Sequence, residues 1–329
     1  MNYKWFIGID IAKKTLDVVL YKKELQKKSP YCQILNNSDG FKYLMNWLKE
    51  QNVVLKHALV CMESTGIYGM ALINFISEKT NYCVESPLHI KRSLGLTRGK
   101  SDKIDAFQIA RFCYLHSEEL LPSRTPSKIM LTLRSLINER ERLVKTRTID
   151  KIIVKELSRE ENRSCIERAE NRINILTEDI IQIEKEIKLV LREDLNIEQN
   201  YNLAKSVTGI GLVNAVMFIL FTNNFNSITD ARKYACYSGI APFEHSSGTS
   251  IQGKTRVSKL SNKRIKVNLT NGARSAIIND PELKLYYKRK KDEGKEHGTI
   301  MNAVKFKLIT RVFATIKRGT PYVKLRLAG

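Results

Sequence analysis

Four carboxylates have the residue types and settings of a site for divalent metal ions. Asp10 interrupts a strongly apolar run, and Glu63 ends another just before a turn-prone Ser-Thr-Gly. Asp102 and Asp105 stand three residues apart at the start of an amphipathic segment. Hard cations take oxygen ligands, and a pair of them would serve phosphoryl transfer by activating an attacking oxygen and stabilising a leaving one. Alone, Asp102 would only cap a helix and Glu63 would only face solvent, but together the four favour a metal site.

The segments around these carboxylates predict strands and helices in alternation. Residues 5–11 and 15–21 indicate two strands that are close enough to form an antiparallel hairpin. Further segments follow, with strands predicted at 58–62 and 82–85 and helices at 39–50 and 67–79. A helix is also expected from Asp102 onward, so that Asp102 and Asp105 project from one face of its first turn. This alternation predicts an α/β domain over residues 1–125.

A hydroxyl-rich segment near residue 247 is a second candidate for chemistry on phosphates. Residues 237–250 read YSGIAPFEHSSGTS and include Ser246 and Ser247. Three basic residues follow, namely Lys254, Arg256 and Lys259. A serine hydroxyl needs a base, a metal or cationic neighbours to attack a phosphodiester. The residues leave two interpretations open, a phosphate-binding loop and a loop with a covalent nucleophile, and by themselves they favour the first.

The net charge is +22 with an isoelectric point near 9.7, and it is distributed unevenly. Residues 201–329 hold 23 Lys and Arg against 7 Asp and Glu, a net charge of +16, whereas residues 131–200 have a net charge of −1. Such a basic C-terminal part implies contacts with the phosphates of a nucleic acid. Helices are predicted at 262–278 and 297–318. Lys263 and Arg264, at the start of the first of them, are candidates for these contacts, although a solvated face would look the same.

The chain resembles a known family, the insertion-sequence one-ten (IS-one-ten) DEDD transposases, or RNA-guided bridge recombinases. The resemblance extends over nearly the whole chain. It rests on GIDIAKKTLDV, MESTGIY, KSDKIDAFQIARF, SVTGIGLVNA and YSGIAPFEHSSGTSIQGKTRVSK. It implies an N-terminal RuvC-like domain of the ribonuclease-H type and a C-terminal transposase domain.

The resemblance also implies which residues act. It assigns the acidic quartet of a Mg²⁺ site, with Mn²⁺ as a substitute, to Asp10, Glu63, Asp102 and Asp105. It implies a serine nucleophile on DNA and a transient phosphoserine link, with Ser247 first because it precedes the glycine and Ser246 in reserve. Element ends and target DNA are the implied substrates, and a non-coding bridge RNA and a site shared between protomers are also implied.

The middle of the chain predicts long helices. Six apolar residues repeat with heptad spacing and form an a/d seam: Ile173, Leu176, Ile180, Ile183, Ile187 and Val190. An apolar pattern in residues 133–157 predicts a partner helix, broken near 160–163. Pairing within one chain and pairing between two copies are both open, and the near-zero charge favours a homodimer or a higher homo-oligomer. The domains expected are 1–125, a coiled-coil region at 126–200, and a mainly α transposase domain at 201–329.

Gly209 and Gly211 lie in a turn between two predicted helices. In a helix-hairpin-helix motif, such glycines let backbone N–H groups approach a DNA phosphate. A turn that only packs two helices together would contain the same glycines. The sequence favours neither interpretation.

The six cysteines are scattered, with no Cys-x-x-Cys pair, which favours free thiols over disulfides or zinc ligands. No signal peptide or membrane-spanning run is expected, so the predicted location is the cytoplasm.

Two rival functions follow from the N-terminal motifs. A junction-resolving endonuclease of RuvC type would use activated water instead of serine and would leave free ends. A sugar-kinase or actin-like ATPase would share GIDIAKKTLDVVL, but it would need a second glycine-rich phosphate loop, and the sequence has no clear candidate. A DNA-bridging protein without catalysis fits four matched carboxylates poorly.

Overall fold

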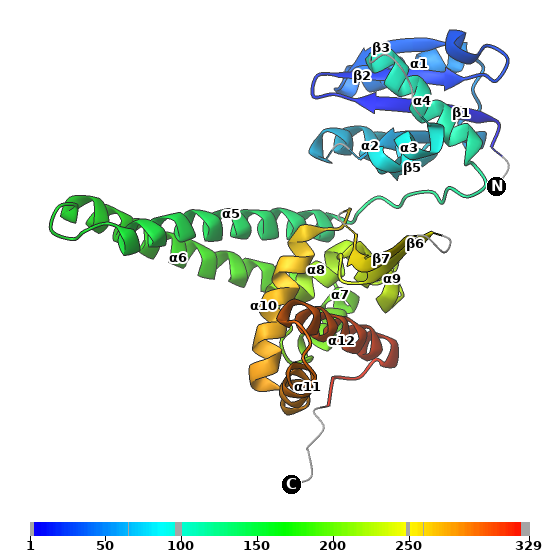
Figure 1. The fold of residues 1–329 in the computed structure, drawn as a ribbon. Helices are drawn as coiled ribbons and strands as arrows, with labels where there is room; N and C mark the ends of the chain where they lie inside the picture. The colour runs from blue at the N-terminus through cyan, green and yellow to red at the C-terminus, as the bar shows by residue number, and fades with distance from the viewer. Residues whose placement is uncertain (1–2, 65, 96–100, 248–250, 259, 324–329) are drawn as a thin grey trace. The chain divides into compact units, whose positions relative to one another are not determined.

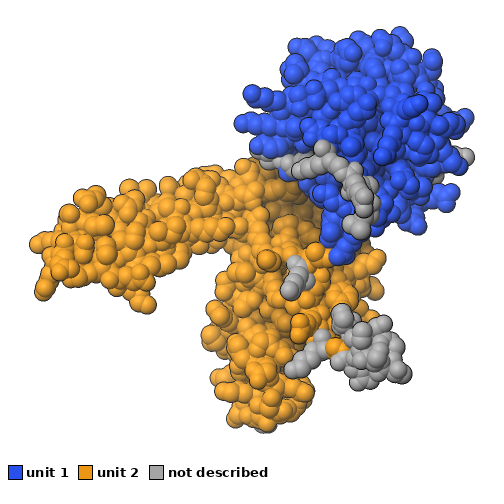
Figure 2. Space-filling model, turned by 45° about the horizontal axis from the view of Figure 1, so that its top comes forward, with its two compact units in different colours: residues 1–125 blue, residues 126–329 orange. Residues whose placement is uncertain are grey.

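The computed structural model describes residues 3–64, 66–95, 101–247, 251–258 and 260–323 (Figure 1). The chain divides into two compact units, Met1–Thr125 and Pro126–Gly329 (Figure 2). Residues 126–200 therefore belong to the same compact unit as the C-terminal helices. Within the described ranges, no helix is both long enough and apolar enough to cross a membrane.

Unit 1 is a mixed α/β domain built on one five-stranded sheet. Its strands are β1 (Trp5–Ile11), β2 (Thr15–Tyr21), β3 (Tyr31–Leu35), β4 (Ala58–Glu63) and β5 (Asn81–Glu85). They lie in the order β3-β2-β1-β4-β5. The strands β1, β2 and β3 pair antiparallel, whereas β4 and β5 run parallel to β1. The predicted hairpin of β1 and β2 is confirmed with the same bounds.

Helices cover both faces of this sheet (Figure 1). The helices α1 (Ser38–Glu50) and α2 (Met70–Ile76) pack on one face, together with Ile7 and Ile9 of β1. The helices α3 (Pro87–Leu94) and α4 (Asp102–Leu115) pack on the other face, together with Phe6. Successive side chains of a strand point to opposite faces, so the even-numbered residues of β1 face α4.

Some predicted elements of unit 1 differ from the structure. The helix expected at 67–79 is shorter, because a 3₁₀ turn at Gly66–Gly69 precedes α2. The strand β3 and the helix α3 were not predicted. Short 3₁₀ turns also occur at Gln26–Lys28 and Leu55–His57.

Unit 2 begins with two long helices, α5 (Lys128–Glu156) and α6 (Arg163–Leu191). They lie side by side and antiparallel within one chain (Figure 1). The ion pairs Arg140–Glu184 and Arg172–Asp150 join them. Of the predicted heptad seam, Ile180 and Ile187 are buried and the other four residues are half-buried. The seam is therefore used for pairing within the chain.

The rest of unit 2 is a helical core with one hairpin. Its elements are α7 (Leu195–Lys205), α8 (Leu212–Thr222), α9 (Ala231–Tyr237), β6 (Pro242–Ser247), β7 (Ile251–Val257), α10 (Lys263–Asn279), α11 (Pro281–Asp292) and α12 (His297–Arg318). The helix α8 is buried along most of its length, and α7, α10 and the C-terminal helix α12 contribute to the core around it. The bounds of α12 agree with the helix predicted at 297–318.

Candidate active site

Asp10 and Glu63 lie at the same edge of the sheet of unit 1. The register pairs Ile9 with Met62 on the parallel strands β1 and β4, so Asp10 and Glu63 occupy the next position on each strand. Leu59 lies four residues before Glu63 on β4, and it packs in the core between the sheet and α4. The alternation of side chains therefore directs both carboxylates to the face that α4 covers.

Asp102 and Asp105 occupy the first turn of α4, as the sequence predicts. The Ser101 hydroxyl caps this helix by accepting a hydrogen bond of 3.3 Å from the backbone N–H of Ile104. Asp102 is exposed and Asp105 is half-buried. A carboxylate is favoured at a helix N-terminus, so the start of α4 is a suitable position for both.

The close contact of α4 with the sheet depends on Gly8, which lies two residues before Asp10. A Cβ atom at this position would lie 2.2 Å from the backbone nitrogen of Ala110 and 2.4 Å from the carbonyl oxygen of Ala106. Only glycine lets the helix backbone approach β1 so closely. Gly8 thereby sets the distance between the carboxylate on β1 and those on α4.

The four carboxylates repel one another. Burial, followed by the charges of Asp105, Glu63 and Asp102, raises the pKa of Asp10 from 3.8 to about 6. Burial also raises the pKa of Glu63; Lys91 lowers it and Asp105 raises it. A divalent cation would relieve this repulsion and would meet the oxygen donors that it prefers. The residues therefore fit a metal ion of this class.

The quartet is nevertheless not a closed cage. Among the described residues, only one group of three or more His, Cys, Asp or Glu has ligand atoms that all lie within 4.8 Å of one another, and it contains no carboxylate. No three of the four acidic side chains therefore have oxygen atoms that all lie within 4.8 Å of one another. Sites in which two ions bind a transferring phosphate need carboxylates that are spread over several ångströms.

Asp17 is a fifth carboxylate that the sequence analysis did not select. It pairs directly with Asp10 across β1 and β2, and only 2% of it is exposed. The Tyr31 hydroxyl donates a hydrogen bond of 2.6 Å to it, and the Gln33 amide donates another at 3.2 Å. The hydrogen bond between Tyr31 and Asp17, followed by burial and the charge of Asp17, raises the pKa of Tyr31 to about 12. The antiparallel register predicted for residues 5–21 was the signal that could have identified Asp17.

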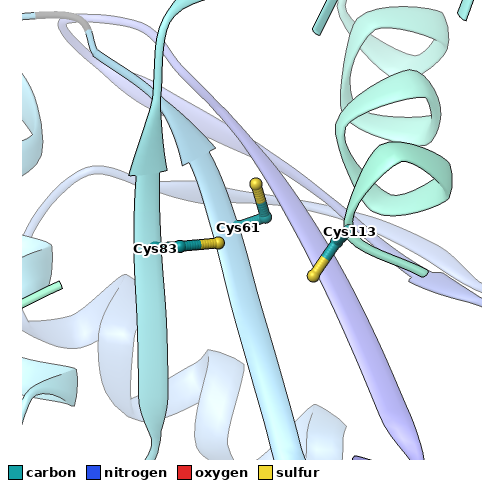
Figure 3. A group of neighbouring side chains, drawn as sticks. All are labelled: Cys61, Cys83 and Cys113. Atoms are coloured by element: carbon teal, nitrogen blue, oxygen red, sulfur yellow. The ribbon is translucent and has the colours of Figure 1, made fainter. Parts of the chain in front are cut away.

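The group with close ligand atoms consists of three buried thiols, Cys61, Cys83 and Cys113 (Figure 3). They come from β4, β5 and α4, and Cys61 and Cys83 are register partners. Their surroundings are the apolar core between α4 and the sheet. All six cysteines are free, as predicted. The three thiols pack as small apolar side chains do, and they contribute to the contact between α4 and the sheet.

The serine segment of unit 2 is a β-hairpin and not the loop expected. The strands β6 and β7 pair antiparallel, with Ser246 opposite Gln252 and Ser247 opposite Ile251. Residues 248–250 and the side chains of both serines lie outside what the structure describes. A loop was predicted because glycine and hydroxyl residues favour turns. The β-branched residues Ile251, Thr255 and Val257, which favour a strand, were given too little weight.

Comparison with known proteins identifies the family. Residues 7–157 match the DEDD transposases of IS110 type, described as "Transposase". Residues 201–288 match the "Transposase IS116/IS110/IS902 family". The chain belongs to the IS110 family of transposases. The first match contains the acidic quartet and the second contains the hairpin. The protein is thus a DNA-binding transposase or recombinase enzyme, and the DEDD family suggests dependence on a divalent metal.

Relatives support the assignment along the whole chain. The transposase is 26% identical over 328 residues to the pilin gene-inverting proteins of Moraxella bovis and Moraxella lacunata, with 98% of each chain covered. It is 30% identical over 124 residues to an uncharacterised 43.6 kDa protein of the insertion element IS110 from Streptomyces coelicolor, covering 38% of this chain and 30% of the relative.

The basic residues of this transposase that were predicted to contact nucleic acid have different surroundings. Arg256 pairs with Phe243 in the hairpin and is exposed, and Lys263 is exposed at the start of α10. The backbone of Lys254 lies in β7, but its side chain and the whole of Lys259 lie outside the described residues. Arg264 donates a hydrogen bond of 2.6 Å to Glu141 and so ties α10 to α5. This ion pair gives Arg264 a structural partner.

The two glycines of the predicted turn also differ. Gly209 has a positive φ of 92°, and a Cβ there would lie 2.5 Å from the carbonyl oxygen of Gly272 on α10. The packing of the turn on α10 is sufficient to explain this glycine. Gly211 precedes α8 and has open space around it. Of the two, only Gly211 has open space beside its Cα atom, at the N-terminus of α8.

Proposed function

We propose that this transposase cuts and rejoins DNA strands through a Mg²⁺-dependent acidic quartet and a serine nucleophile. One observation supports the metal-dependent part of this proposal. Asp10, Glu63, Asp102 and Asp105 lie on one face at one edge of the sheet. The strand order of unit 1, with an acidic residue on its central strand β1, supports a ribonuclease-H-like, RuvC-like domain. Mn²⁺ would substitute, because it takes the same oxygen ligands.

In the proposed reaction the Ser247 oxygen attacks a DNA phosphorus atom. A Ser–O–P bond forms, the bond from phosphorus to the O3′ oxygen breaks, and the serine proton passes to the leaving O3′. The 3′-hydroxyl of a second strand then attacks the phosphoserine, which restores a phosphodiester and returns a proton to the serine. Bound metal ions would supply charge neutralisation at the phosphate. Arg256, which is exposed on the hairpin, is suited to bind the same phosphate.

The family resemblance motivates further parts of the proposal. A bridge RNA would select donor and target DNA, and a homodimer or larger homo-oligomer would let the quartet and the serine come from different protomers. The name of the Moraxella relatives suggests inversion of a DNA segment as one outcome. Since the substrate is cellular DNA, the proposed location is the cytoplasm.

The test is to trap the covalent intermediate. Wild-type, Ser247→Ala, Ser246→Ala and Asp10→Ala proteins are incubated with Mg²⁺, labelled element-end DNA and the RNA encoded beside the element, and denaturing gels follow. We expect a labelled protein–DNA adduct that Ser247→Ala and Asp10→Ala abolish and Ser246→Ala keeps. Free cleaved ends in every serine variant, with no adduct, would instead identify an endonuclease that activates water.

A further inference from the structure

A cavity of about 540 Å³ opens between α10 and the first turns of α12, within unit 2. Lys266 and Thr270 line it from α10, and His297, Asn302 and Lys305 line it from α12. It lies outside the acidic quartet, which belongs to unit 1. The chemistry of its lining is that of an anion site.

The burial of the charged Lys305 side chain in this cavity is not explained by the fold alone. Only 4% of it is exposed, yet its ammonium group donates a hydrogen bond of 3.3 Å to a neutral group, the Thr270 hydroxyl. Among the described residues, no carboxylate forms an ion pair with it. Burial, and then the charge of Lys266, lowers its pKa from 10.5 to about 8. A buried charge without a counter-charge destabilises a protein, so a retained one needs a ligand or another reason.

The surroundings of Lys305 reinforce a positive potential. Lys266 lines the same cavity, and α12, a helix of 22 residues, begins there at His297. No side chain caps this helix, and a Cβ at Gly298 would meet nothing within 4 Å, so the first turn is open to an approaching group. Helix N-termini attract anions. Among the described residues of the lining, Glu296 is the one carboxylate, and it is exposed.

A second, larger cavity of about 950 Å³ adjoins the first. Thr299 and Asn302 line both cavities. The larger one continues to the base of the serine hairpin, where Phe243 and Arg256 line it. An aromatic ring beside an arginine is a suitable surface for a nucleotide. The two cavities together therefore lead from Lys305 to the hairpin that carries Ser247.

We propose that Lys305 and Lys266 bind a backbone phosphate of the nucleic-acid strand that the hairpin acts on. The adjoining cavity holds the neighbouring nucleotide, and the two contacts position the strand at the hairpin. This inference rests on the proposed function, since it names a contact of the same strand. Lys305 is then a positioning residue. Its buried charge destabilises the free protein, and the bound phosphate offsets this effect.

The experiment compares full-length wild-type protein with Lys305→Met, and uses Lys284→Met on the exposed surface of α11 as the matched control. The affinity for a labelled DNA duplex is measured over a series of salt concentrations, and thermal unfolding is measured without DNA. Loss of one phosphate contact should reduce the slope of log affinity against log salt by about 0.9 and weaken binding by about tenfold. In the absence of DNA, Lys305→Met should melt a few degrees higher than wild type. A purely structural lysine would instead give a lower melting temperature.

The outcomes separate this inference from the proposed function. If wild type does not bind DNA or RNA, both fail. If wild type binds but Lys305→Met keeps the same affinity and salt slope, only the phosphate site fails. A defect limited to RNA in a parallel titration would assign the phosphate to RNA. If inorganic phosphate stabilises wild type alone while nucleic-acid binding is unchanged in the variant, the cavity is a site for free anions and the inference is overturned.

Discussion

At the scale of single residues, Asp10 carries an electrostatic cost that its function requires. Its carboxylate is half-buried among four other acids, so replacing it with a neutral isostere should stabilise the protein in the absence of metal. We expect Asp10→Asn to raise the free energy of unfolding by roughly 1–2 kcal/mol in EDTA, less than the full pKa shift implies because solvent reaches the site. Thermal unfolding measures this, with Glu118→Gln, at an exposed position, as control. A lower melting temperature for Asp10→Asn would contradict the assignment.

The raised pKa of Asp10 also predicts the effect of pH. Since the pKa is about 6 in the folded state against an ordinary value of 3.8, the folded protein binds more protons between these values than the unfolded chain does. Stability in EDTA should therefore fall as pH rises from about 4 to about 6 and then level off. Metal affinity should rise over the same window, because the ion competes with the proton. Melting curves against pH, with and without Mg²⁺, test both trends. In Asp10→Asn, the melting temperature in EDTA should change little between about pH 4 and about pH 6.

Some residues of the site were visible in the sequence and others were not. The quartet could be selected because each acid interrupts or ends a distinctive pattern. Asp17 was missed, although the predicted hairpin of residues 5–21 could have placed it opposite Asp10. Cys61, Cys83 and Cys113 could not be selected, because their proximity arises from strand register and from the packing of α4 on the sheet. The charge on Lys305 could be counted, but its burial depends on the packing of α10 against α12, which spacing alone does not reveal.

At the scale of elements, the approach of α4 to β1 sets the geometry of the quartet. Gly8→Ala places a methyl group against the backbone of α4, so the helix must move away from the strand. We expect a loss of about 1–3 kcal/mol in stability and a marked loss of metal-dependent cleavage even where the protein is folded. Ile7→Val is the matched control, since it weakens the core on the opposite face of the sheet and leaves α4 in place. Equal activity per folded molecule in both variants would refute this role of Gly8.

Regular elements with a clean pattern were predicted best. The strands β1 and β2 and the helix α12 have the predicted bounds, because apolar runs and helical periodicity are local signals. The edge strand β3 reads YCQIL, with only one residue fully buried, so its pattern was too weak. The β6–β7 hairpin was hidden by glycine and serine, whose preference for turns is local, whereas strand pairing is not.

At the scale of the whole molecule, the pairing of α5 with α6 leaves another apolar surface. Ile175, Ile181 and Leu189 on α6 are 50–60% exposed. If copies associate through this region, they should do so by this surface, because the heptad seam is already occupied within the chain. We expect the double variant Ile181→Glu with Leu189→Glu to be monomeric by light scattering with an unchanged melting temperature. Wild type that is itself monomeric at all concentrations would exclude association through α6.

The charge distribution makes a further prediction for the whole molecule. With a net charge of +22, the transposase should bind random-sequence DNA with an affinity that falls steeply as salt increases. Anisotropy titrations from low to physiological salt measure the slope. A slope near zero would mean that the basic surface does not contact phosphates.

The acidic quartet and the serine hairpin lie in two separately compact units of one chain. In genetic terms, this separation defines two classes of inactive allele, one with a defective quartet and one with a defective serine. If protomers share their sites as proposed, a mixture of Asp10→Ala and Ser247→Ala proteins would regain activity that neither shows alone. A cell that carries two differently damaged copies of the element would then still be able to move it.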